Sequence, residues 1–188
     1  PEAWDAVTGA IRPLPEFEDD GRRTTLPMVL EPNQSLFVVL RADGAGAAHR
    51  DGTANFPTPV RVKTLDGPWT LTFQEGRRGP AEPVVADELK DLRLSDDESV
   101  RYFSGSVRYE TTFDLRGKEK SGRLYVNTGR VGVMAKVYVN GKYAGGVWTA
   151  PYRVDVTDFV RKGKNTLVID VVNTWVNRLI GDSRLPED

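Results

Sequence analysis

The stretch VGVMAKVYVNGKYAGGVW, residues 131–148, places an Asn-Gly pair between two runs of alternating side chains. Alternation of apolar and polar residues with a period of two is typical of a β-strand with one buried face. Asn140 and Gly141 both tolerate the positive φ angles that a two-residue type I′ turn requires. The stretch therefore predicts a tight antiparallel hairpin of strands 131–139 and 142–148.

The segment before this hairpin shows an equally regular alternation. In residues 106–114, every second side chain is charged or polar, and the others form the face that we expect to be buried. That face consists of Val107, Tyr109, Thr111 and Phe113. Comparable patterns predict further strands at 69–73, 123–127, 152–157 and 166–172.

Patterns with the 3.6-residue helical period are scarce. Residues 157–160 predict a single helical turn capped by Thr157 or Asp158, and 161–165 predict the turn that precedes the last strand. A short helix is the other candidate, over 86–92. We therefore expect a nearly all-β protein.

The first 59 residues are organised differently from the rest. Strands are predicted there at 11–17, 24–30 and 35–41, with turns at 20–21 and 31–33. Because three strands bury little apolar surface, 1–41 are predicted to be the terminal strands of a preceding β domain, or to pack against the main sandwich. Residues 42–59 have the composition of a linker, with several glycines and two prolines.

The remaining sequence is assigned to one main domain, residues 60–182, followed by a truncated tail at 183–188. The sequence starts at Pro1 and ends on a polar stretch, so we expect both ends to be cuts in a longer chain.

Composition excludes several classes of partner. No apolar run approaches the roughly 20 residues that a membrane-spanning helix needs. The formal net charge is -1 and the basic residues are spread along the chain, which is not the pattern of a nucleic-acid-binding protein. We therefore expect no nucleic acid and no membrane as partner. The absence of cysteine excludes disulfides and thiolate chemistry but leaves the compartment open.

Three segments together resemble the sugar-binding domain of glycoside hydrolase family 2, which has a galactose-binding-like fold. They are YFSGSVRYETTF at 102–113, GRVGVMAKVYVNGKYAGGVWTAPYRVDVT at 129–157 and GKNTLVIDVVNTW at 163–175. The resemblance covers about residues 60–182 and implies an antiparallel jelly-roll β-sandwich, preceded by a few strands from an adjacent β domain.

A closer likeness is to the C-terminal region of α-L-rhamnosidase-like enzymes of glycoside hydrolase family 106. It is carried by WVNRLIGD at 175–182 and, near the start, by WDAVTG at 4–9, LEPNQS at 30–35 and FVV at 37–39. The resemblance implies a non-catalytic accessory domain of a secreted or periplasmic enzyme, whose catalytic domain lies upstream and is the expected partner.

Two interpretations of this domain stay open. It positions the catalytic domain, with or without contact to plant or microbial glycans, or it is an autonomous carbohydrate-binding module with a sugar site at the loop end of the sandwich. Sugars stack their apolar faces on flat rings while polar side chains bind the hydroxyls. The candidate residues for carbohydrate or interdomain contact are Trp148, Tyr152, Asn173, Trp175, Asn177, Arg178 and Asp182. The best candidate surface is the loop expected after the last strand, at 175–182.

Other chemistry finds little support in the sequence. No catalytic residue is predicted, because no pair of carboxylates stands out and the acidic residues at 87–98 read as a solvated surface. His49, the single histidine, falls in the expected linker without a second ligand nearby. No cofactor is expected, but jelly rolls of this type often carry a structural calcium, so the metal content stays open.

Overall fold

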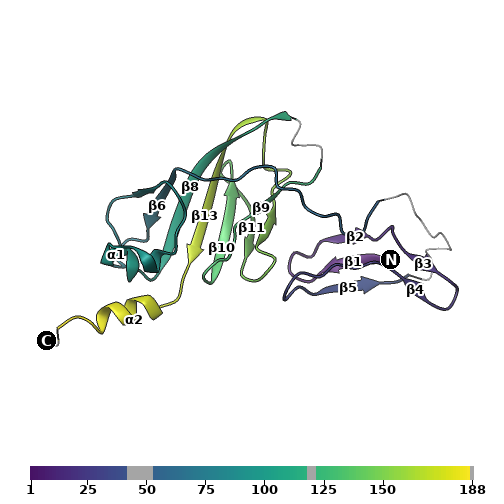
Figure 1. The fold of residues 1–188 in the computed structure, drawn as a ribbon, viewed down its shortest axis with the longest axis horizontal. Helices are drawn as coiled ribbons and strands as arrows, with labels where there is room; N and C mark the ends of the chain where they lie inside the picture. The colour runs from purple at the N-terminus through teal and green to yellow at the C-terminus, as the bar shows by residue number, and fades with distance from the viewer. Residues whose placement is uncertain (42–52, 118–121, 187–188) are drawn as a thin grey trace. The chain divides into compact units, whose positions relative to one another are not determined.

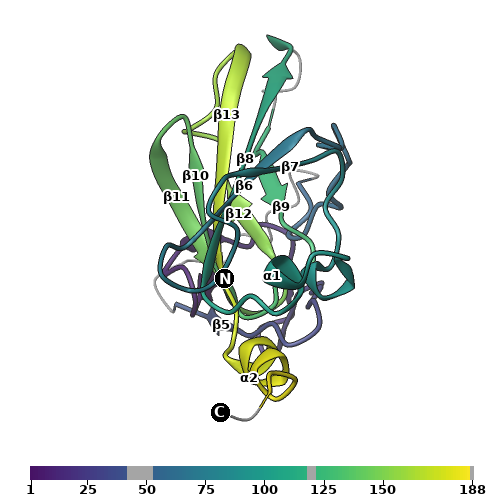
Figure 2. The ribbon, with the colours of Figure 1, turned by 90° about the vertical axis from the view of Figure 1, so that its left-hand side faces the viewer.

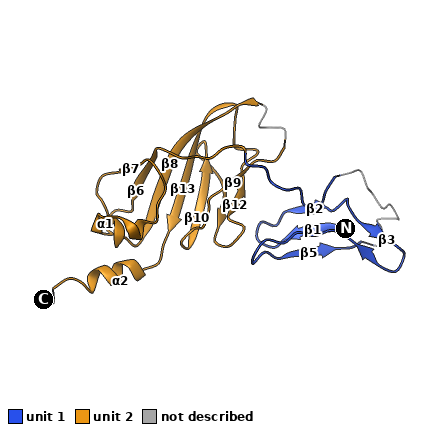
Figure 3. Ribbon diagram, viewed as in Figure 1, with its two compact units in different colours: residues 1–61 blue, residues 62–188 orange. Residues whose placement is uncertain are grey.

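The protein is described by a computed structural model that covers residues 1–41, 53–117 and 122–186. It divides into two compact units, Pro1–Arg61 and Val62–Asp188 (Figure 3). The expected linker at 42–59 lies largely outside the described residues.

Unit 1 is a small β structure with little core. Its three-stranded antiparallel sheet has the order β2-β1-β5 and is built from β1 (Glu2–Asp5), β2 (Ile11–Pro13) and β5 (Leu36–Val39). A short pair, β3 (Glu18–Asp19) and β4 (Thr24–Thr25), closes at the turn predicted at 20–21. The strand expected at 11–17 ends early at Pro13, and β1 was not predicted.

Asn55 is a buried polar residue that connects distant parts of unit 1 through hydrogen bonds. Its side chain is buried, accepts a hydrogen bond from the backbone N–H of Glu16 at 2.9 Å and donates one to the Glu16 carbonyl at 2.6 Å. Arg12 also donates to the Asn55 carbonyl, at 2.8 Å. The end of the segment expected to be a linker therefore packs into unit 1, because the Asn55 side chain pairs with both backbone groups of Glu16 in the connection between β2 and β3.

Unit 2 is an antiparallel β-sandwich, as the sequence predicts. Its main sheet has six strands in the order β11-β10-β13-β8-β6-β7, and a second sheet pairs β12 with β9 (Figures 1 and 2). The main-sheet strands are β6 (Trp69–Phe73), β7 (Val84–Ala86), β8 (Ser106–Leu115), β10 (Met134–Val139), β11 (Lys142–Val147) and β13 (Gly163–Val172). The second sheet consists of β9 (Tyr125–Asn127) and β12 (Arg153–Asp155).

The predicted hairpin is confirmed at the level of backbone angles. Asn140 and Gly141 have φ angles of 52° and 78°, and Val139 pairs with Lys142 across the turn. The register then shifts between Val137 and Tyr138, which is a β-bulge. On β11, Gly145 has a φ of 152°, and a Cβ atom there would lie 3.0 Å from the Val154 side chain.

The core of unit 2 lies between the two sheets and follows the predicted alternation. Val107, Thr111 and Phe113 of β8 are buried and Tyr109 is half-buried, while the intervening side chains are exposed. Val107 and Phe113 belong to one continuous cluster of buried apolar side chains that also includes Trp69, Val137 and Leu167. On the outer face, Arg108 and Asp170 pair across β8 and β13 with a nitrogen–oxygen distance of 2.8 Å.

The helices differ from those expected. Residues 86–92 do not form a helix; β7 ends at Ala86 and a short 3₁₀ helix, η1 (Leu92–Leu94), comes later. Asp91 caps η1 and Asp97 caps α1 (Glu98–Arg101), each accepting a backbone N–H two residues further on. The acidic residues of this connection therefore start two short helices.

The turn at 157–160 forms, with the N–H groups of Phe159 and Val160 both donating to the Val156 carbonyl. The predicted caps, Thr157 and Asp158, are wrong. Asp155 caps the turn, because its carboxylate accepts the Thr157 N–H at 3.0 Å. The prediction of a loop at 175–182 is wrong, because residues Val176–Asp182 form a helix, α2.

Candidate functional site

The candidate residues lie at one end of the main sheet. Val147 of β11 and Val171 of β13 both lie opposite Ala135, so the segments that follow these two strands leave the sheet at the same end. Trp148 follows β11 there and is 54% exposed. Tyr152 is half-buried against the core, and its carbonyl accepts the Thr128 N–H at 2.9 Å.

Asn173 ties the end of β13 to the loop before β8. Its side-chain oxygen accepts the Gly105 N–H at 2.8 Å, and its amide nitrogen donates to the Phe103 carbonyl at 2.9 Å. Both polar atoms of the side chain are therefore occupied by backbone groups. The structure assigns Asn173 to holding this end of the sandwich.

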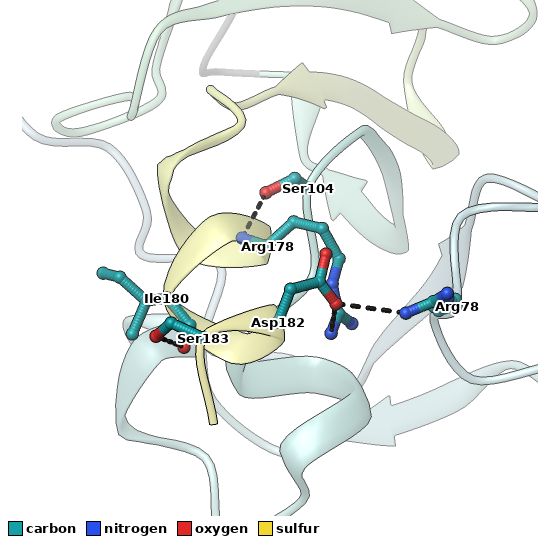
Figure 4. A network of polar contacts seen from close by, with 6 residues as sticks. All are labelled: Arg78, Ser104, Arg178, Ile180, Asp182 and Ser183. Carbon is teal, nitrogen blue, oxygen red and sulfur yellow. Dashed lines mark hydrogen bonds and ion pairs between the residues drawn. The ribbon is translucent and has the colours of Figure 1, made fainter. Parts of the chain in front are cut away.

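α2 docks on the same loop through its inner face. The Arg178 N–H donates to the hydroxyl of the buried Ser104 at 3.0 Å (Figure 4). Gly181 is buried, and a Cβ atom added there would lie 2.8 Å from the Cβ of Tyr102. The absence of a side chain at 181 therefore lets the helix approach Tyr102 closely.

A charged network holds the last turn of α2. One Asp182 carboxylate oxygen accepts from the Arg178 guanidinium and, at 3.0 Å, from Arg78 of the β6–β7 connection (Figure 4). The hydrogen bond from Arg178, together with the charges of Arg178 and Arg78, lowers the pKa of Asp182 below its ordinary value. The carboxylate therefore stays ionised at neutral pH and serves as an anchor.

The outer face of α2 carries exposed apolar side chains. Trp175, Val176, Leu179 and Ile180 are between 45% and 64% exposed. The guanidinium carbon of Arg77 lies 4.9 Å from the centre of the Trp175 ring. Helices of globular domains normally turn their apolar stripe toward the core. In α2 the inner face carries polar side chains and a glycine, and the outer face is apolar. An exposed apolar face of this kind is typical of a surface that another protein or domain covers.

A groove lies between α2, η1 and α1, and it adjoins the outer face of α2 at Ile180. We call it the arginine groove: its volume is about 380 Å³, and Arg93, Arg101 and Arg184 line it together with Leu94, Tyr102, Asn177 and Ile180. Asn177 is the one predicted candidate that contributes to it. The three arginines were missed, because they come from separate segments and form no pattern in the sequence.

The sequence left the metal content of the protein open. Residues 1–41, 53–117 and 122–186 hold no group of three His, Cys, Asp or Glu side chains placed to bind a metal ion. A calcium held mainly by carbonyls stays a prediction, and His49 lies outside the described residues. Within the same residues, no helix has the length and apolarity to cross a membrane.

Residues 84–185 match the family model of the glycosyl hydrolase 2 galactose-binding domain-like proteins. The chain belongs to this family. The galactose-binding-like fold predicted from the sequence is thereby confirmed, and with it the assignment of the chain to glycoside hydrolase-like proteins.

Two relatives place the galactose-binding-like domain within larger proteins. A rhamnosidase from Novosphingobium sp. PP1Y has a similar structure, with a TM-score of 0.82 and 38% identity; the match covers 100% of this chain and 17% of the rhamnosidase. The protein named "Putative beta-glucuronidase" in Formosa agariphila is 39% identical over 139 residues, which are 70% of this chain and 11% of that protein. The chain therefore spans a small part of the length of both relatives.

A beta-glucuronidase of an uncultured Clostridium sp. shares the fold at 23% identity. The TM-score is 0.52, and the match covers 63% of this chain and 24% of that protein.

Proposed function

We propose that the chain is a non-catalytic accessory module of a glycoside hydrolase, and that the outer face of α2 docks on the catalytic domain of the parent enzyme. The observation that carries the proposal is the row of exposed apolar side chains on α2, Trp175, Val176, Leu179 and Ile180. The choice of occupant is supported by the match to a rhamnosidase of which this chain spans 17%, since the remaining part of that protein is much larger than the matched part. An interface core is apolar and rich in aromatic side chains and arginine, and Trp175 under Arg77 has that chemistry.

The state of the acidic residues supports a non-catalytic role. The acid of a glycosidase needs a raised pKa so that it holds a proton at working pH. Asp91, Asp97 and Asp182 instead have pKa values below the ordinary one, chiefly because of hydrogen bonds from Arg93, Ser99 and Arg178 respectively. These carboxylates serve as helix caps and ion pairs.

Substitution of Leu179 tests the docking. In the isolated chain, Leu179→Asp should change the free energy of unfolding by no more than about 0.5 kcal/mol, because Leu179 is exposed. In the parent enzyme it should destabilise the contact between domains by about 1–3 kcal/mol, since a buried aspartate finds no partner in an apolar interface. Thermal unfolding and glycoside hydrolysis of the parent are the measurements.

The matched control is Val85→Asp, which adds the same charge at an exposed apolar residue of the edge strand β7. If both variants behave alike in the parent, α2 is not the docking face. If the isolated chain hydrolyses aryl glycosides, the proposal of a non-catalytic module fails.

The exposed ring of Trp148 favours a second candidate function, an autonomous carbohydrate-binding module. Rings that lie free at a loop end are the platforms on which sugars stack. To separate the two functions, the isolated chain is titrated with rhamnose- and galactose-containing oligosaccharides, and Trp fluorescence reports binding. Binding that is lost in Trp148→Ala would favour the module, whereas absence of binding leaves the docking role.

The proposed localisation of the parent enzyme is the periplasm or the exterior of the cell, where plant and microbial glycans are accessible. The support is the resemblance to glycan-degrading enzymes. Cell fractionation with an antibody against this domain tests the placement, and recovery in the cytoplasm would contradict it.

A further inference from the structure

The arginine groove has a size and lining that suit a small ligand. Its volume of about 380 Å³ falls within the range of small-molecule sites, roughly 300–1,000 Å³. Leu94 and Ile180 offer apolar contact, and Asn177 offers an amide that both donates and accepts hydrogen bonds. This mixture matches a sugar ring, which has apolar C–H faces and polar hydroxyls.

The charge of the groove is positive. Arg93 is neutralised by Asp91, with which it forms an ion pair. Arg101 and Arg184 have no carboxylate partner among the described residues, 1–41, 53–117 and 122–186. Two uncompensated guanidinium groups therefore face the same hollow.

These two guanidinium groups are held in place by Tyr102. The guanidinium carbons of Arg101 and Arg184 lie 5.8 Å and 5.3 Å from the centre of its ring, within the range of cation–π contacts. Arg101 is fixed further by a hydrogen bond from its Nε to the Ser95 carbonyl at 2.6 Å. Its two terminal nitrogens thus remain to donate, and planar guanidinium groups recognise carboxylates and sulfates through paired donors.

We propose that the arginine groove binds an anionic sugar unit, a uronate or a sulfated sugar. Arg101 and Arg184 hold the anionic group, and Asn177 with Leu94 and Ile180 contacts the ring. Because Ile180 lines the groove and also lies at the edge of the apolar outer face, a bound unit would lie beside the docked catalytic domain, and this last step alone rests on the proposed function. The groove would then recruit acidic glycans to the parent enzyme.

The isolated 188-residue chain is sufficient for the test. It is titrated with methyl glucuronide, glucose 6-sulfate and neutral methyl glucoside, with binding followed by NMR shifts of the amides around Tyr102. One or both anionic sugars should bind at least about ten-fold more tightly than the neutral one, since one charge-assisted contact is worth about that factor. The two anionic probes distinguish a uronate site from a sulfate site.

Three variants locate the binding. Arg184→Ala removes an exposed arginine and should weaken binding of the anionic sugar by about ten-fold, as should Arg101→Ala. The matched control is Arg108→Ala, which removes an arginine from the outer face of β8 and should leave binding unchanged. Circular dichroism checks that each variant is folded; Arg184 is at the surface, so its variant keeps the test valid if Arg101→Ala unfolds.

Several results would overturn the proposal. They are equal binding of neutral and anionic sugars, no binding of either, inorganic sulfate binding as tightly as glucose 6-sulfate, and a glutamate-rich peptide binding more tightly than the sugars. None of these results depends on the docking of α2, which Leu179→Asp tests in the parent enzyme. The two proposals therefore fail independently.

Discussion

At the scale of single residues, Asn165 connects the turns of the sandwich. Its side chain is fully buried, and its amide nitrogen donates to the carbonyls of Arg161 and Gly163, each at 2.8 Å. Its oxygen accepts from the Arg161 N–H and from the side chain of Asn140, again at 2.8 Å. One asparagine thus joins the Asn-Gly hairpin to the turn before β13.

Asn165→Ala should lower the free energy of unfolding by about 3 kcal/mol, because it leaves buried backbone groups without partners. The control is Asn177→Ala, which removes the same side chain from a partly exposed position and should cost less than about 0.5 kcal/mol. Urea denaturation of both variants is the measurement. Equal losses would show that the buried network does not stabilise the fold.

The two asparagines show what sequence can predict at this scale. The role of Asn140 in a type I′ turn depends on its neighbour Gly141 and was readable directly. Asn165 looked like an ordinary turn residue, because its bond to Asn140 joins positions 25 apart in sequence. A buried polar group whose partners are brought together by the fold leaves no local pattern.

At the scale of elements, α2 was mistaken for a loop for physical reasons. Its apolar residues face outward and its interior holds Gly181, which has a low helix propensity. The helix is held by Ser104, Tyr102 and Arg78, which come from two earlier connections. The longer strands of unit 2, in contrast, carried their alternation in a single segment each and were predicted, whereas the short strands β1 and β7 were not.

Gly181→Ala should loosen α2, although alanine favours helix. The added Cβ would meet the Tyr102 Cβ at 2.8 Å, and that atom cannot move without its buried backbone. Overpacking of this kind costs about 1–3 kcal/mol, more than the roughly 1 kcal/mol that alanine gains in a helix. Limited trypsin cleavage after Arg178 and Arg184 should accelerate in the variant.

Gly132→Ala is the control, because a Cβ there meets no atom within 4 Å. Cleavage of Gly132→Ala should match the wild type. If Gly181→Ala were cleaved no faster, close contact with Tyr102 would not be what holds α2.

The anchor at Asp182 predicts how α2 responds to acid. Because the pKa of Asp182 is lowered in the folded chain, its stabilising effect is present above the ordinary aspartate pKa of about 3.9 and is lost as the pH falls through the lowered value. Asp182→Asn should therefore speed amide exchange at Arg178 at neutral pH, relative to the wild type. The difference should disappear in acid, where both side chains are neutral.

NMR exchange rates, corrected for the intrinsic rate at each pH, provide the measurement. A difference between wild type and Asp182→Asn that persists unchanged below the lowered pKa would show that the charge of Asp182 does not anchor the helix.

At the scale of the whole molecule, the chain combines a family-defining sandwich with surfaces that the family pattern does not predict. The sandwich of unit 2 could be predicted because its hairpin, strands and turns are local features. The arginine groove could not, since η1, α1 and α2 meet only after folding. The packing of Asn55 into unit 1 was missed for the same reason.

At neutral pH in the parent enzyme, we expect a larger protein to cover the outer face of α2. The decisive measurement is hydrogen–deuterium exchange of residues 175–182, compared between the isolated chain and the parent glycoside hydrolase. Exchange should be at least about ten-fold slower in the parent, because the docked interface must open before the amides exchange. Equal exchange in the two proteins would show that no other domain covers α2.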